Sequence, residues 1–100
     1  MIQEKGQRGV LQIRDQSILE YARSLSDGMH YAMIPSNTDI TITDAPTTGR
    51  GFVVEIFKVN NVIRLQASQF NTSRYIYQRL FYNTTWYDWQ VFTGVPIETM

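Results

Sequence analysis

The stretch that decides the fold is residues 51–92, GFVVEIFKVNNVIRLQASQFNTSRYIYQRLFYNTTWYDWQVF. Apolar and polar residues alternate over much of it, and short polar segments interrupt the alternation at 60–61, 70–73 and 83–85. Alternation with a period of two is typical of β-strands, and each interruption contains Asn, which tolerates the positive φ of tight turns. The sequence therefore predicts an antiparallel meander of consecutive strands joined by these turns. The expected bounds of the strands are 52–59, 62–67, 74–82 and 86–92.

The alternation also predicts which side chains share a face of the sheet. In the second strand, Ile63 and Leu65 fall on one face, whereas Arg64 and Gln66 fall on the other. The first strand is different, because residues 52–59 are almost wholly apolar. A run of this kind is typical of a strand that is covered on both sides, so we expect both of its faces to be buried.

A short helix is expected upstream, at residues 17–25, where apolar residues recur at helical spacing. Ser17 and Glu20 have the spacing of a capping box, and Gly28 can take the left-handed conformation that ends a helix. The predicted fold class is therefore mainly β: a small antiparallel β-meander preceded by one short N-terminal α-helix.

The other segments are expected to be an extended arm or short strand over the first fifteen residues, two further strands and a turn-rich loop. The two strands are predicted at 29–34 and 38–43, and the loop at 44–50. The predicted organisation is one domain with three parts. These are an N-terminal arm and helix at 1–27, an antiparallel β domain at 28–93 and a C-terminal tail at 94–100.

Composition excludes several classes of partner. The formal net charge is zero over 100 residues, so the basic surplus typical of proteins that bind nucleic acid or anionic membranes is missing. No apolar run approaches the roughly 20 residues that span a bilayer, so membrane insertion is not expected. A net charge near zero does little to keep copies of the chain apart, which is compatible with self-association.

The residue types that carry catalysis do not cluster in the sequence. There is no cysteine, and His30 is the only histidine. The carboxylates Asp39, Asp44, Glu55 and Asp88 are spread over different strands and loops, with no nucleophile–base pair, metal cluster or phosphate loop among them. We therefore expect a protein that is not an enzyme and that needs no metal or other cofactor.

Aromatic residues are concentrated between 75 and 92. Tyr82, Trp89 and Phe92 are expected in the core, where rings fill a small β fold as cross-strand partners. Strand alternation sends Trp86 and Tyr87 to opposite faces, so some aromatic area must lie at the surface or against another subunit. There the rings can stack on sugars beside hydrogen-bonding side chains, and packing between subunits explains the same residues equally well.

The order and spacing of several short motifs resemble the knob domain of phage tail fibres and of the related pyocins. That family has an entry strand, a loop rich in Pro, Thr and Gly, an apolar strand, a polar–apolar hairpin, a strand with Arg and aromatic residues, and a closing Trp-x-x-Trp. The corresponding residues here are 25–31, 45–51, 52–56, 62–66, 74–79 and 85–89. The chain departs from the family at Met29-His30, where two aromatic residues are common, and at Tyr87-Asp88, where small residues are usual.

The resemblance implies a homotrimeric virion component near the end of a tail fibre or baseplate appendage, with a role in attachment to the host surface. It would be made in the host cytoplasm and act extracellularly, together with other phage tail proteins. Its expected target is a bacterial cell-surface glycan, either a polysaccharide or a teichoic acid. Because knobs of this family differ in whether they touch the receptor, the alternative is a structural connector or trimerisation module with no receptor contact. A depolymerase is disfavoured, since such enzymes need a larger groove and closely placed carboxylates.

A ligand-binding surface is expected from the aromatic residues and their polar neighbours. Trp86 is expected to be its exposed ring, whereas Trp89 is expected to be a wedge in the core. The candidate ligand-binding residues are Arg64, Gln66, Arg74, Tyr75, Tyr77, Trp86 and Asp88.

Overall fold

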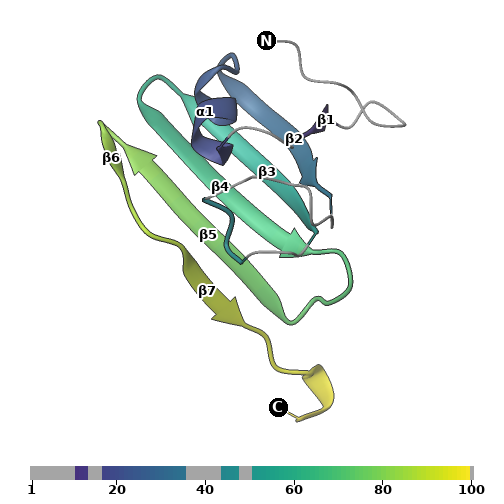
Figure 1. The fold of residues 1–100 in the computed structure, drawn as a ribbon. Coiled ribbons are helices and arrows are strands. Elements are labelled where there is room, and N and C mark those ends of the chain that lie inside the picture. The colour runs from purple at the N-terminus through teal and green to yellow at the C-terminus, as the bar shows by residue number, and fades with distance from the viewer. Residues whose placement is uncertain (1–10, 14–16, 36–43, 48–50, 100) are drawn as a thin grey trace.

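The computed structural model describes residues 11–13, 17–35, 44–47 and 51–99, and its fold is mainly antiparallel β with one short α-helix near the N-terminus, as predicted (Figure 1). The predicted strand at 38–43 lies outside the described residues, as do positions 48–50 of the predicted loop. The strands are β1 (Leu11–Gln12), β2 (Gly28–Ile34), β3 (Phe52–Val59), β4 (Val62–Gln69), β5 (Tyr75–Tyr82), β6 (Thr85–Trp86) and β7 (Gln90–Thr93). The helices are α1 (Ile18–Arg23) and the short 3₁₀ helix η2 (Ile97–Thr99).

The strands form one seven-stranded sheet in the order β1-β2-β3-β4-β5, with β6 and β7 both paired to the outer edge of β5. β2 to β5 are antiparallel neighbours, which confirms the predicted meander, whereas β1 pairs with β2 in parallel. The turn between β3 and β4 is the predicted Asn60-Asn61 pair, and Asn60 has a φ of 52°. At the turn between β5 and β6, Asn83 and Thr84 have φ values of 51° and 81°.

The helix begins where its cap predicts. Ser17 is the N-cap residue, and its Oγ accepts a hydrogen bond of 2.9 Å from the backbone N–H of Glu20. The helix ends at Arg23, two residues before the predicted end, because Ser24 already serves as the C-cap. Gly28, with a φ of 128°, then begins β2.

The core lies between α1 and one face of the sheet, which we call the covered face (Figure 1). Alternate residues of β2 to β5 point into it, as a period of two requires. No described element packs on the opposite face, which we call the open face. The buried core side chains are Ile13, Ile18, Tyr21, Ala22, Ala32, Ile34, Phe52, Val54, Ile56, Ile63, Leu65, Ala67 and Phe81.

The expectation that β3 is buried on both faces is wrong for the single chain. Phe52, Val54 and Ile56 are fully buried on the covered face, but Val53 and Phe57 are 46% and 39% exposed on the open face. The apolar composition of β3 predicted a second covering layer, and the described part of the chain supplies a layer on one side only.

The predicted last strand at 86–92 is also wrong as a continuous element, because β6 and β7 are separated by residues 87–89. Phe81 pairs with Trp86, whereas Gln78 pairs with Gln90, so the outer strand holds one more residue than β5 between these pairs. An insertion of this kind is a β-bulge. Strict alternation would place Trp86 and Trp89 on opposite faces, and the extra residue lets both pack against the covered core.

Candidate functional site

The predicted ligand-binding residues do not form one site. Arg64 and Gln66 lie on the open face, and Asp88 lies at its edge. Tyr77 and Trp86 pack against the core on the covered face instead. Tyr75 shares the face of Tyr77, with ring centroids 6.3 Å apart, and the guanidinium of Arg74 lies 5.6 Å from the Tyr75 ring centroid.

Trp86 is not the exposed ring that the sequence predicted. Its ring is partly buried, and the guanidinium carbon of Arg79 lies 3.9 Å from the ring centroid and 5.9 Å from that of Trp89. Arg79 Nε also donates a hydrogen bond to the Tyr87 carbonyl oxygen. The two tryptophans therefore hold a largely buried cation, an arrangement that stabilises the sheet edge, and both rings are partly buried against the core.

Trp89 behaves as the core wedge that was expected. Its Nε1–H donates to the Asp44 carbonyl oxygen at 2.8 Å. The Asp44 carboxylate accepts hydrogen bonds from the backbone N–H groups of Ile18 and Leu19, at 2.8 and 3.1 Å. Asp44 thus connects the start of α1 to Trp89 at the outer edge of the sheet. Asp44 is therefore a structural carboxylate.

The expectation that Tyr82 and Phe92 belong to the core is wrong. Their side chains are 55% and 49% exposed. Both occupy open-face positions, because Tyr82 alternates with the buried Phe81 and Phe92 pairs with the exposed Ile76. Both rings therefore belong to the exposed aromatic surface that the sequence predicted.

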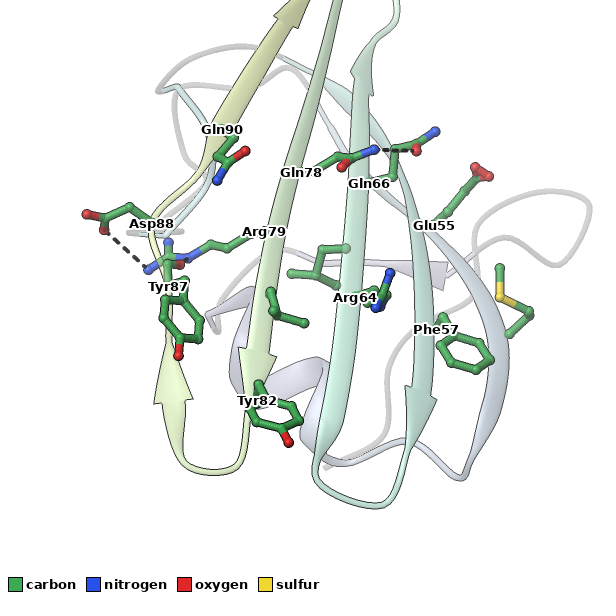
Figure 2. A pocket seen from close by; sticks show the side chains of 13 residues that line it. Glu55, Phe57, Arg64, Gln66, Gln78, Arg79, Tyr82, Tyr87, Asp88 and Gln90 are labelled. Atoms are coloured by element: carbon green, nitrogen blue, oxygen red, sulfur yellow. Dashed lines mark hydrogen bonds and ion pairs between the residues drawn. The ribbon is translucent and has the colours of Figure 1, made fainter.

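The open face carries a hollow of about 660 Å³, within the size range of small-molecule sites (Figure 2). It extends over β3, β4 and β5 to the segment that joins β6 to β7. Aromatic and aliphatic side chains border it, and polar side chains cross it. The side chains that matter most for its chemistry are Glu55, Arg64, Gln66, Gln78, Tyr82 and Gln90.

Four polar side chains form a row across this hollow, which we call the polar row: Glu55, Gln66, Gln78 and Gln90. Glu55 pairs with Gln66 in register, Gln66 with Gln78, and Gln78 with Gln90, so each side chain comes from the next strand of the sheet. Gln78 Nε2 donates to Gln66 Oε1 at 3.2 Å (Figure 2). Of the row, sequence reasoning named only Gln66.

The register of the hairpin predicts one more member of the row. A two-residue turn at Asn60-Asn61 places Glu55 opposite Gln66, and this pairing is the one observed. The position of Gln90 depends on the bulge in the outer strand, which no local sequence pattern predicts.

The charges around the hollow are few and balanced. The two carboxylates are Glu55 and Asp88, and the two guanidiniums are Arg64 and Arg79. Arg79 and Asp88 lie 4.0 Å apart, and the Asp88 side chain is fully exposed. Across the described ranges, Glu55 and Arg64 form no ion pair.

Three other features bear on what the chain can do. His30 Nε2 donates to the Ser26 carbonyl oxygen at 2.8 Å, so it stabilises the local backbone. Among the residues that the structure describes, no group of three or more His, Cys, Asp or Glu side chains is placed to hold a metal ion. The same residues include no helix with the length and apolar character needed to cross a bilayer.

Comparison with known proteins gave no match to a protein-family model, to a curated protein or to a solved structure.

Proposed function

We propose that this chain is a non-enzymatic attachment module of a phage tail fibre or baseplate appendage, which binds glycan on the surface of a bacterial host through the open face of its sheet. The observation that carries the proposal is the hollow on that face, where amide, guanidinium and carboxylate groups lie among exposed rings. Sugars offer hydroxyl groups and apolar ring faces, which match polar side chains beside aromatic ones. The resemblance of residues 25–92 to tail-fibre knobs supports the same function.

The separation of the carboxylates favours binding over hydrolysis. Glu55 belongs to β3, and Asp88 lies beyond β6 at the outer edge of β5, so three strand spacings separate them. At about 4.8 Å per spacing their backbone positions are about 14 Å apart across the sheet, whereas the carboxyl pairs of glycosidases are separated by roughly 5–9.5 Å. These two groups are too distant to act on one glycosidic bond.

A second function is a structural connector that holds three copies together, and the β2–β3 half of the open face favours it. Met29, Tyr31, Val53, Phe57 and Val59 are between 38% and 59% exposed there. Neighbouring exposed apolar side chains on this scale are typical of surfaces that meet another protein subunit. Both functions are compatible with a homotrimer, and they differ in whether the assembled chain binds host cells.

Co-sedimentation with intact cells from a panel of bacteria tests the attachment function. The wild-type chain and Phe70→Ser are expected to bind the cells of a susceptible host, while Tyr82→Ser loses most of the binding. Phe70 is the matched control because its ring is 49% exposed in the turn after β4, away from the hollow, whereas Tyr82 lines it. A trimeric mass in solution without binding to any cells would favour the connector instead.

A further inference from the structure

The polar row consists of long side chains with planar polar ends, aligned across neighbouring strands. Its members project from neighbouring strands (Figure 2). Neighbouring strands lie about 4.8 Å apart, so each strand adds one hydrogen-bonding side chain across the hollow. An extended ligand lying across the strands meets one such group at each strand.

Much of the hydrogen-bonding capacity of the row is unused. The Gln78–Gln66 bond occupies one amide donor and one amide acceptor. In the described part of the chain, the side chains of Glu55 and Gln90 have no hydrogen-bond partner. Three amides and one carboxylate offer both donors and acceptors, which is what a ligand with several hydroxyl groups requires.

Apolar side chains border the polar row at the next open-face positions of the same strands. On one side Met29, Phe57, Arg64 and Leu80 occupy adjacent strands, so a single guanidinium sits among apolar groups. Tyr82 occupies the next open-face position of β5 after Leu80. Sugar rings have apolar C–H faces, and exposed rings such as Tyr82 and Phe57 can pack against them.

The charge of the hollow favours a neutral polysaccharide over an anionic polymer such as a teichoic acid. Arg79 already contacts Asp88 and the two tryptophan rings, which leaves Arg64 as the cation available to a ligand. Glu55 in the row and Asp88 at the rim oppose an anionic polymer. A phosphate-rich chain such as a teichoic acid would need a surplus of Lys and Arg, which this site does not have.

We infer that the polar row is the binding site for a neutral, hydroxyl-rich glycan segment that lies across β3, β4, β5 and β7. The inference rests on the proposed attachment function and deepens it by naming the site and the ligand class. In the site, ligand hydroxyls donate to the Glu55 carboxylate and to the amide oxygens of the row. Amide N–H groups and Arg64 donate to ligand oxygens.

The test is a glycan array containing neutral bacterial polysaccharides, uronic-acid polymers and glycerol-phosphate polymers, followed by titration calorimetry at low and high salt. We expect binding to a neutral polysaccharide with little dependence on salt. The double variant Gln66→Ala/Gln78→Ala is expected to lose at least about tenfold in affinity, since each lost hydrogen bond contributes about 1 kcal/mol and 1.4 kcal/mol is a factor of ten. Gln69→Ala is the matched control, because this amide lies on β4 outside the hollow, and it is expected to bind like the wild type.

A second variant keeps the test decisive if the double variant unfolds. Glu55→Gln preserves the shape of the row, removes one negative charge and is expected to weaken neutral-glycan binding several-fold without creating affinity for phosphate polymers. Binding confined to anionic polymers and abolished by salt would overturn the inference. So would unchanged affinity in folded Gln66→Ala/Gln78→Ala.

The possible outcomes distinguish failure of the proposed glycan site from failure of the proposed attachment function. If the wild type binds host cells and the row variants bind them equally well, the inference fails and the attachment function stands. If the wild type binds neither cells nor any glycan, the attachment function fails and the inference fails with it. A change in the solution mass of the double variant, with no change in affinity, would assign the row to a subunit contact and overturn the glycan site.

Discussion

The covered and open faces of this sheet are built by the same strands and differ in what lies on top of them. On β3, Phe52 is fully buried and Phe57, five residues later, is 39% exposed. Both are phenylalanines in the same strand, and one points toward α1 while the other points away from it. Alternation therefore assigns a side chain to a face, whereas burial depends on whether another element packs there. The covered face accounts for the fold, and the open face is the surface to which we assign the proposed contact with other molecules.

The largest effect is expected from truncating the two phenylalanines separately. Phe52→Ala should lower the free energy of unfolding by about 3–5 kcal/mol, because it leaves a cavity in the core. Phe57→Ala should lower it by less than about 1 kcal/mol, because the ring is already partly in water. Urea denaturation of both variants measures the difference. Equal losses would mean that the open face is buried against another copy of the chain, which would break the comparison.

Much of this architecture follows from local sequence patterns. The meander, the Asn60-Asn61 turn and the Ser17 cap are predictable because each depends on residues close together in the chain. The role of Asp44 is not, since its carboxylate accepts from the Ile18 N–H across 26 residues of sequence. The bulge likewise follows from no local pattern; it turns Trp86 and Trp89 to one face, where both rings lie close to Arg79 of the neighbouring strand.

The same distinction limits what could be predicted of the site. Sequence alternation placed Arg64 and Gln66 on one face correctly, and it placed them opposite the core residues Ile63 and Leu65. It could not show that no element of the described residues covers this face. Sequence reasoning therefore combined residues of both faces into one candidate site, because aromatic content alone does not distinguish a core ring from a surface ring.

A second test compares two carboxylates. Asp44→Ala should destabilise the protein by about 1–2 kcal/mol, because the first N–H groups of α1 lose their acceptor beside the core. Asp88→Ala should stay within about 0.5 kcal/mol of the wild type, because its ion pair with Arg79 is exposed on the Asp88 side. Thermal denaturation followed by circular dichroism measures both. If Asp88→Ala proved the more damaging change, the assignment of structural roles to the covered side would be wrong.

The smallest effect concerns Tyr21, a buried ring of the covered face. Its hydroxyl has no hydrogen-bond partner within the described residues, and burial raises the pKa of this phenol above its ordinary value of 10.0 by desolvation. Tyr21→Phe should therefore leave stability unchanged at neutral pH or raise it by up to about 1 kcal/mol. The open-face substitution Tyr82→Phe is the control and should leave neutral-pH stability unchanged.

The pH dependence of the Tyr21 effect has a definite sign. Above pH 10 the unfolded tyrosine loses its proton while the buried one keeps it, so the native state binds more protons and stability falls as pH rises. The loss begins near the ordinary pKa and continues up to the raised pKa of the folded state. Denaturation midpoints between neutral and alkaline pH should show a smaller decline for Tyr21→Phe than for the wild type. Parallel declines would contradict a raised pKa for this group.

The central claim, that the open face is where this chain meets its partner, is tested most directly by hydroxyl-radical footprinting of the chain free and bound to host envelope. Met29, Tyr31 and Tyr82, all more than half exposed on the open face, are expected to lose reactivity on binding. Phe70, exposed in the turn after β4, is expected to keep it. Protection of Phe70 with unchanged reactivity at Met29, Tyr31 and Tyr82 would contradict the claim.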